Sequence, residues 1–186
     1  MQRFPPEGED PGIVLERLSR FSRGEPEPSS GRMFTHSYET GDPVLRELVR
    51  KAYELYMDKT MLDFTVYPSV LRLEREVVRA VAYLMDGDEE TKGSFTYGGT
   101  ESILLAVKAA RDYFRALGRT ETPEIILPYT AHPAFLKAAS YLNLKPVFIP
   151  IDPGTGKIDI NAVNERISRN TALIVGCFLF DMNRED

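Results

Sequence analysis

Two adjacent glycines, Gly98 and Gly99, stand between a β-prone run and a helical pattern, and this part of the sequence is the best suited to hold an anion. Glycine lets the backbone approach a ligand closely. The first N–H groups of the following helix have no acceptor inside the helix, and the helix dipole adds positive potential there. The stretch therefore predicts a phosphate-binding turn, with a strand over residues 94–97 before it and a helix that begins at Thr100 or Glu101.

A turn without a ligand is the competing interpretation of the same residues. Thr100 would then be only the N-cap of the helix. The stretch is not a Walker loop, because no Gly-Lys-Ser or Gly-Lys-Thr follows, and it lacks the Gly-x-Gly-x-x-Gly fingerprint of dinucleotide sites. The glycines and Thr100 alone favour the turn without a ligand, so the surrounding sequence has to decide.

Three blocks of sequence, taken in order, resemble one family of enzymes. The family is the pyridoxal-phosphate (PLP) lyases of the sphingosine-1-phosphate lyase and group II amino-acid decarboxylase type. The similar blocks are residues 96–103 with 109–112, residues 123–142 and residues 167–175. The resemblance runs from about Glu39 to about Gly176, which is most of the chain. Three blocks in the same order are more specific than any one of them.

The resemblance implies a cofactor and three residues that contact it. PLP (pyridoxal 5'-phosphate) would be the cofactor, Gly99 and Thr100 would hold its phosphate, and His132 would stack on its pyridine ring. The substrate would be an amino acid or a phosphorylated amino alcohol, because PLP serves as the electron sink for a carbanion in both kinds of lyase. No catalytic residue and no metal ligand is assigned in this chain.

Both histidines also have interpretations that need no cofactor. Pro133 after His132 favours the first turn of a helix, so His132 could simply start that helix. His36 lies in a candidate extended arm, residues 33–38, and is expected at the surface or at an interface. In the resembled family such an arm lies across the partner subunit, so the resemblance implies a homodimer or a complementary chain.

Two residues that the resembled family uses for catalysis are missing from this sequence. In the family, a lysine that directly follows a histidine forms the Schiff base with PLP, and an aspartate of an Asp-Ala pair faces the pyridine nitrogen. This sequence has neither a His-Lys pair nor an Asp-Ala pair. Residues 60–65 also replace the Asn-Pro-Leu-His segment of lyase relatives, so the residues do not distinguish a decarboxylase from a phosphoaldehyde lyase.

The resemblance ends after Gly176, and two interpretations follow. The first is the N-terminal part of a PLP-dependent carbon–carbon lyase, truncated, frameshifted or split, and inactive as this chain alone. The alternative is a non-catalytic remnant or interaction module that keeps half of a cofactor pocket. In both, strands 94–97 and 171–178 would have lost neighbours, and unpaired strand edges favour association with another chain.

Composition and charge exclude several classes of protein. The net charge of −5 argues against a nucleic-acid partner. The one cysteine, Cys177, excludes an internal disulfide and suits a reducing compartment. No apolar run reaches the length of a membrane span, and the N-terminus lacks the apolar core of a signal peptide. The expectation is a soluble cytoplasmic protein.

Periodicity and turn residues predict an α/β fold with a mainly parallel sheet and flanking helices, behind a helical N-terminal segment. The expected helices are residues 13–21, 43–56, 68–84, 100–117, 133–142 and 160–167, and the expected strands are residues 94–97, 124–127, 146–151 and 171–178. The apolar stripes of the early helices are expected to be ordinary core faces. The expected domains are residues 1–92, an arm with helices, and residues 93–186, the first part of an incomplete PLP fold type I large domain.

Overall fold

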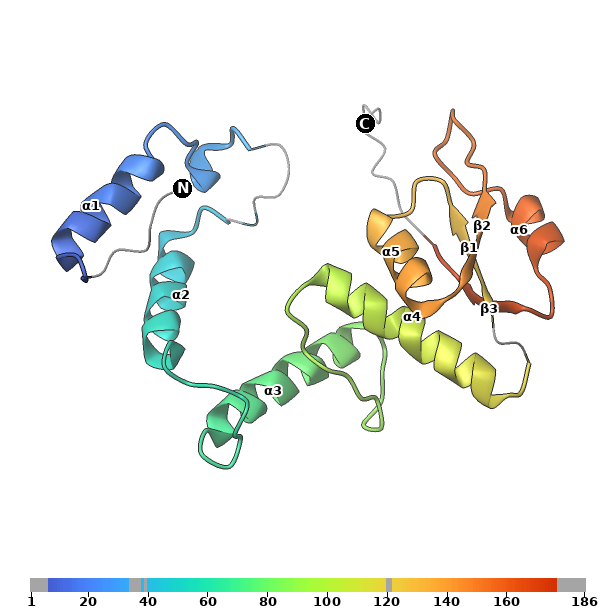
Figure 1. Ribbon diagram of the computed structural model, residues 1–186, viewed down its shortest axis with the longest axis horizontal. Coiled ribbons are helices and arrows are strands. Elements are labelled where there is room, and N and C mark those ends of the chain that lie inside the picture. The colour runs from blue at the N-terminus through green and yellow to red at the C-terminus, as the bar shows by residue number, and fades with distance from the viewer. Residues whose placement is uncertain (1–6, 34–37, 39, 120–121, 177–186) are drawn as a thin grey trace. The chain divides into compact units, whose positions relative to one another are not determined.

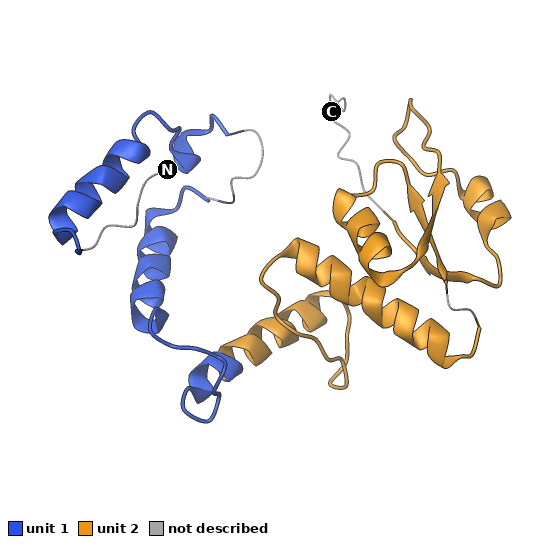
Figure 2. Cartoon of the chain, viewed as in Figure 1, with its two compact units in different colours: residues 1–71 blue, residues 72–186 orange. Residues whose placement is uncertain are grey.

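The computed structural model describes residues 7–33, 38, 40–119 and 122–176. The chain divides into two compact units, residues 1–71 and 72–186 (Figure 2). The boundary falls inside helix α3 (Pro68–Leu84). The boundary expected from the sequence, at residue 93, concerns the family's domains and stays a prediction. His36 of the expected arm and Cys177 lie outside the described residues.

The first unit contains α1 (Pro11–Phe21), a short 3-10 helix η1 (Pro28–Ser30), α2 (Pro43–Tyr56) and the start of α3. Asp42 caps α2: its carboxylate accepts the N–H of Val44 at 2.8 Å, and Pro43 occupies the first turn. Asp10 caps α1 in the same way, accepting the N–H of Gly12 at 2.8 Å. The cap at Asp42 explains why α2 begins where the sequence predicts, and the cap at Asp10 explains why α1 begins at Pro11, two residues before the predicted start.

The apolar stripes of α1, α2 and α3 are not core faces of this chain, which corrects the expectation from their periodicity. None of the three helices has a buried residue. On α2, Leu48 and Val49 are each 60% exposed. Periodicity shows that a helix has an apolar face, and it does not show which polypeptide covers that face.

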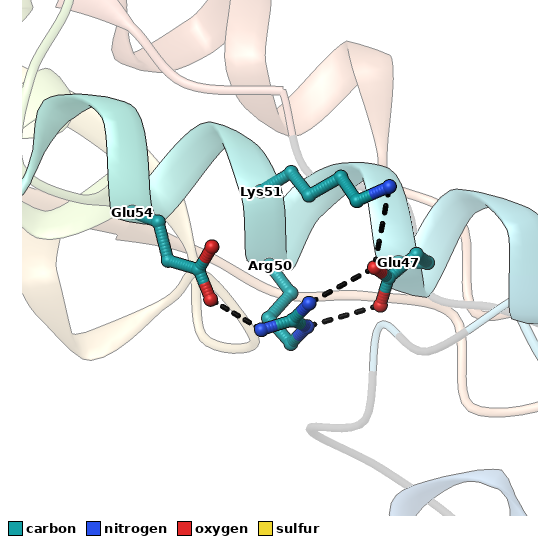
Figure 3. Close-up of polar contacts among 4 residues, drawn as sticks. All are labelled: Glu47, Arg50, Lys51 and Glu54. Carbon is teal, nitrogen blue, oxygen red and sulfur yellow. Dashed lines mark hydrogen bonds and ion pairs between the residues drawn. The ribbon is translucent and has the colours of Figure 1, made fainter.

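Four charged residues of α2 pair with one another within the helix. Arg50 pairs with Glu47 at 2.9 Å and also with Glu54, and Lys51 pairs with Glu47 at 3.5 Å (Figure 3). Such pairs lie one helical turn apart and stabilise an exposed helix modestly. These four charged residues of α2 therefore pair within the helix, whereas its apolar face lacks a partner among the described residues.

The second unit carries a three-stranded parallel sheet with helices, as the α/β prediction requires (Figure 1). The strand order is β2-β1-β3, with both neighbours parallel to the central strand β1. The strands are β1 (Glu124–Pro128), β2 (Lys145–Ile149) and β3 (Thr171–Ile174), and the helices are α4 (Gly99–Ala116), α5 (Pro133–Leu142) and α6 (Ile160–Arg166).

Some predicted ends differ from the observed ones. Strand β2 stops at Ile149, and Ile151 makes only an isolated antiparallel bridge to Ile158. Helix α6 ends at Arg166, one residue before the predicted end. After α4, Gly118 has a φ of 68°, a left-handed backbone conformation that glycine adopts readily at the end of a helix. Strand β3 ends at Ile174, so the predicted extension to residue 178 is wrong for residues 175 and 176, and the remaining positions lie outside the described residues.

The core of the second unit lies on both faces of β1. Its residues alternate between the two faces, as the strand period of two requires. On one face Ile125 and Leu127 pack with Val107 of α4 and Ala138 of α5. On the other face Ile126 packs with Ile149 of β2 and Val163 of α6. Helices α4 and α5 thus cover one face of the sheet and α6 the other, and the near-continuous burial of β1 follows.

The outer edge of β2 is blocked for further strand pairing. The carbonyl of Ile149 accepts the N–H of Tyr129, the residue after β1, at 3.2 Å. Because backbone groups alternate in direction along a strand, those of Pro146 and Phe148 point away from β1. Pro146 has no N–H to donate, and the carbonyl of Phe148 accepts a hydrogen bond from Arg166 Nη1 at 3.1 Å. Among the described residues, β3 has only β1 as a neighbour and carries no equivalent block.

Candidate cofactor site

Helix α4 begins at Gly99, and Gly98 is its N-cap. The predicted start at Thr100 or Glu101 is therefore late, and Thr100 is not the N-cap. A glycine cap has no side chain to accept a helical N–H. The backbone N–H groups of Glu101 and Ser102 donate to the Gly98 carbonyl at 3.0 and 3.1 Å. In the described part of the chain, the N–H groups of Gly98, Gly99 and Thr100 have no acceptor, so three consecutive donors remain for a ligand.

The positions of Gly98 and Gly99 are not crowded by other described parts of the chain. A Cβ built on Gly98 or Gly99 would meet no atom within 4 Å. Gly98 has an extended backbone with a φ of 176°, which any residue adopts, so the glycines serve close approach rather than an unusual backbone angle. Open space, three free donors and the positive end of the helix dipole are what an oxyanion needs. The glycine turn, defined as Gly98, Gly99 and Thr100, is the candidate phosphate site.

The predicted strand over residues 94–97 is wrong, because that segment pairs with no strand among the described residues. Its backbone donors are used by side chains instead. The N–H of Phe95 donates to Glu74 Oε1 at 2.9 Å, and the N–H of Tyr97 donates to Glu101 Oε2 at 2.7 Å. The β-propensity of the segment is real, but propensity forms a strand only where a neighbouring strand is available.

Two hydroxyl groups join the segment before the glycine turn to the helix after it. Thr96 Oγ1 and Ser102 Oγ lie 2.5 Å apart, and Thr96 Oγ1 also donates to the Gly98 carbonyl at 3.3 Å. The sequence prediction missed both residues and missed Glu74. Glu101 has a detectable signal, a glutamate three residues after an N-cap, as in a capping box. Glu74 has none, since its partner Phe95 lies far along the chain.

His132 is the N-cap of α5, which confirms the interpretation that it starts a helix. Its Nδ1 accepts the N–H of Ala134 at 3.1 Å, and its side chain is exposed. An accepting Nδ1 places the proton of the neutral ring on Nε2. The cap fixes the orientation of the imidazole and leaves its faces uncovered, so the stacking role implied by the family stays a prediction.

Helices α4 and α5 lie on the same face of the sheet and pack on the same core residues. Helix α4 leads into the amino end of β1, whereas α5 begins just after the carboxyl end of β1. The N-termini of both helices are therefore directed toward the carboxyl side of the sheet. Open α/β sheets bind their ligands on that side. The topology thus directs the helix starts that carry the glycine turn and His132 toward the same side of the sheet.

No helix among the described residues is long and apolar enough to traverse a bilayer. The same residues contain no group of three or more His, Cys, Asp or Glu side chains arranged to hold a metal ion.

The fold defines a class, the PLP-dependent enzymes of fold type I, to which the structural neighbours belong. One of these neighbours is the structure of a sphingosine-1-phosphate lyase from Burkholderia pseudomallei, which aligns with a TM-score of 0.85 and 33% identity. The alignment covers 94% of this chain and 41% of the Burkholderia chain. Residues 64–180 match the model of the DegT/DnrJ/EryC1/StrS aminotransferase family, and the chain belongs to this family.

Two further relatives confirm the resemblance drawn from the three sequence blocks. The chain is 37% identical over 175 residues to sphingosine-1-phosphate lyase 1 of Mus musculus, covering 94% of this chain and 30% of the mouse protein. It is 32% identical over 174 residues to a probable L-aspartate decarboxylase of Pyrococcus furiosus, covering 94% of this chain and 44% of that protein. The chain thus spans less than half the length of each of these relatives.

Proposed function

We propose that this chain forms the phosphate-binding part of a PLP-dependent carbon–carbon lyase, of the sphingosine-1-phosphate lyase or amino-acid decarboxylase kind. The observation that carries the proposal is the glycine turn. Three consecutive N–H donors lack an acceptor among the described residues at an uncrowded helix start, in a chain of this family. That arrangement suits the phosphate of PLP.

Different residues of this chain would contact the phosphate and the ring of the cofactor. Gly99 and Thr100 would bind the phosphate through their backbone N–H groups. His132, held by its bond to Ala134, would cover one face of the pyridine ring. PLP supplies an electron sink when it is bound. The substrate would be a small amino acid or a phosphorylated amino alcohol, by analogy with the named relatives.

We further propose that these 186 residues alone do not turn over substrate. The sequence has no His-Lys pair to attach PLP covalently and no Asp-Ala pair to face the pyridine nitrogen. Both groups act on the same chemistry, because one fixes the cofactor and the other keeps its ring protonated. Residues outside these 186 would have to supply them.

A second role, an interaction module, is favoured by helix α2. Four of its charged residues, Glu47, Arg50, Lys51 and Glu54, pair within the helix, whereas its apolar face is exposed among the described residues. We propose a second copy of this chain as the partner that covers this face. The compartment proposed for this assembly is the cytoplasm, on the basis of the single cysteine in the sequence.

The variant Gly99→Val tests the phosphate site. Its added side chain meets no protein atom within 4 Å, so it would fill the space that a phosphate needs without a clash inside the protein. We expect inorganic phosphate and PLP to bind at least about tenfold more weakly, since charge-assisted hydrogen bonds would be lost. Gly8→Val, also at an uncrowded glycine, is the matched control. Unchanged phosphate affinity in Gly99→Val would place the site elsewhere.

A further inference from the structure

We propose that Glu74 and Glu101 are positioning residues that hold the glycine turn open for its anion. The inference rests on the proposed function, because it concerns the proposed phosphate site. Neither carboxylate would contact the phosphate. Each accepts a backbone N–H of the segment that leads into the turn, one from helix α3 and one from helix α4.

Glu101 makes an unusual form of helix cap. In a capping box, a glutamate at this helical position accepts the N–H of the N-cap residue itself. Here Glu101 Oε2 accepts the N–H of Tyr97 at 2.7 Å, one residue earlier than the N-cap Gly98. The N–H of Gly98 is therefore spared, and it joins those of Gly99 and Thr100 as a donor without an acceptor in the described part of the chain.

Glu74 fixes the other end of the same segment against α3. Its Oε1 accepts the N–H of Phe95 at 2.9 Å. One helical turn further along α3, Val78 lies against Gly93, where an added Cβ would come within 3.1 Å of Val78 Cγ1. The order of these two contacts shows that residues 93–95 run antiparallel to α3. Glycine at 93 permits this close approach.

The two carboxylates accept the hydrogen bonds that a neighbouring strand would accept from this segment. In an extended segment, the N–H groups of residues two apart point to the same side. Phe95 and Tyr97 are two apart, and a neighbouring strand would accept both donors. Glu74 and Glu101 accept them instead, and hydrogen bonds to ionised acceptors are stronger than neutral ones. The turn is thus pre-positioned by side chains rather than by pairing in the sheet.

Charge and hydrogen bonding have opposite effects on an anion at this turn. A carboxylate near the site repels phosphate, whereas its hydrogen bond to the backbone holds the donors in place. Glutamine keeps an acceptor oxygen and removes the charge, and alanine removes both. Glutamine and alanine variants therefore separate the positioning role from a role of charge alone.

The experiment titrates inorganic phosphate into the 15N-labelled 186-residue chain and follows the amide signals of the glycine turn. The variants are Glu74→Gln, Glu74→Ala, Glu101→Gln and Glu101→Ala. Glu76→Ala is the matched control, because Glu76 is exposed on the same helix and pairs only with Arg72. Amide hydrogen exchange at Phe95 and Tyr97 provides a second readout that does not depend on the ligand.

We expect both alanine variants to bind phosphate about fivefold more weakly, as the loss of one hydrogen bond predicts. Both glutamine variants should bind phosphate at least as tightly as the unmodified chain. The amide hydrogen of Tyr97 should exchange faster in Glu101→Ala but not in Glu101→Gln. The amide hydrogen of Phe95 should likewise exchange faster in Glu74→Ala but not in Glu74→Gln. Glu76→Ala should change neither readout.

Three outcomes would overturn the inference. Tighter phosphate binding in the alanine variants would show that the carboxylates act only as charges. Weaker binding in the glutamine variants would show that an acceptor oxygen without its charge does not hold the turn, and this outcome remains measurable if an alanine variant does not fold. Unchanged affinity in the alanine variants would show that the turn holds its own shape. If instead the unmodified chain's glycine-turn amides do not respond to phosphate, the proposed function itself fails, and this inference with it.

Discussion

The Nδ1 atom of His132 accepts the backbone N–H of Ala134 at 3.1 Å, so the residue proposed to cover a cofactor ring also caps helix α5. The two roles can be separated by substitution. His132→Ala removes cap and ring together, and loss of an N-cap costs about 1 kcal/mol of stability. His132→Asn keeps a capping oxygen and removes the imidazole.

We therefore expect a lower melting temperature for His132→Ala and a near-unchanged one for His132→Asn, measured by thermal denaturation. Both variants should bind PLP more weakly while binding inorganic phosphate normally, because the imidazole would face the ring and not the phosphate. Unimpaired PLP binding by His132→Asn would leave the histidine with the capping role alone.

A second prediction concerns acid stability and Glu124. Its carboxylate accepts hydrogen bonds from Lys145 Nζ at 3.0 Å and from Ser168 Oγ at 2.9 Å, at the amino end of the sheet. The bond from Lys145, and then that from Ser168, hold the pKa of this carboxyl below its ordinary value. A lowered pKa in the folded state means that the ionised form stabilises the fold.

This stabilisation is fully present above the ordinary glutamate pKa of about 4.3 and is lost as the pH falls through the lowered pKa. Glu124→Gln should thus be less stable than the unmodified chain at neutral pH and should lose less stability on acidification. Urea denaturation across this pH window measures both effects, with exposed Glu165→Gln as the control. If the free energy of unfolding changed with pH equally in Glu124→Gln and in the unmodified chain, Glu124 would not be the source of this acid sensitivity.

The third prediction is that the chain by itself has no PLP-dependent lyase or decarboxylase turnover. After incubation with PLP and reduction with borohydride, peptide mapping should find no lysine labelled stoichiometrically, since no lysine follows a histidine. Stoichiometric labelling of one lysine, together with amine or aldehyde product, would show that the chain holds a complete site. Activity that returns when a polypeptide with the missing residues is added would favour a split enzyme over a remnant.

The fourth prediction is self-association through α2. The exposed side chains of Leu48 and Val49 should make the molar mass measured by light scattering rise with protein concentration. Leu48→Gln should reduce this association, whereas Lys51→Gln on the polar face should leave it nearly unchanged. A stable monomer over a wide concentration range would refute a second copy as the partner, and mass gained only with a different chain would point to a complementary polypeptide.

The elements that could be predicted from the sequence are those specified by neighbouring residues. Asp42 and Pro43 mark the start of α2, Pro133 the start of α5, and the apolar run of β1 its burial. The segment 94–97 has the residues of a strand, yet strand formation needs a partner, and the described chain offers two carboxylates instead. Whether an apolar helix face is covered depends likewise on residues that the pattern does not contain.

The candidate site was predictable to the same extent. The glycine pair and the following Thr100 predict a helix start that can bind an anion, because both the turn and the N–H groups at a helix start are local properties. Glu74 contributes through a contact with Phe95 that no spacing rule connects to it. A residue that acts by holding another segment in place leaves no signature in its own neighbourhood.

The contact of Arg166 with the Phe148 carbonyl has a consequence for how far any assembly through the sheet could grow. A fibre built by strand addition needs two receptive edges on every molecule, so that each copy accepts one neighbour and offers a template to the next. Pro146 and Arg166 remove one of these edges. Two copies joined at their β3 edges would therefore offer no second open edge. Pro146 and Arg166 would thus prevent open-ended polymerisation through the sheet.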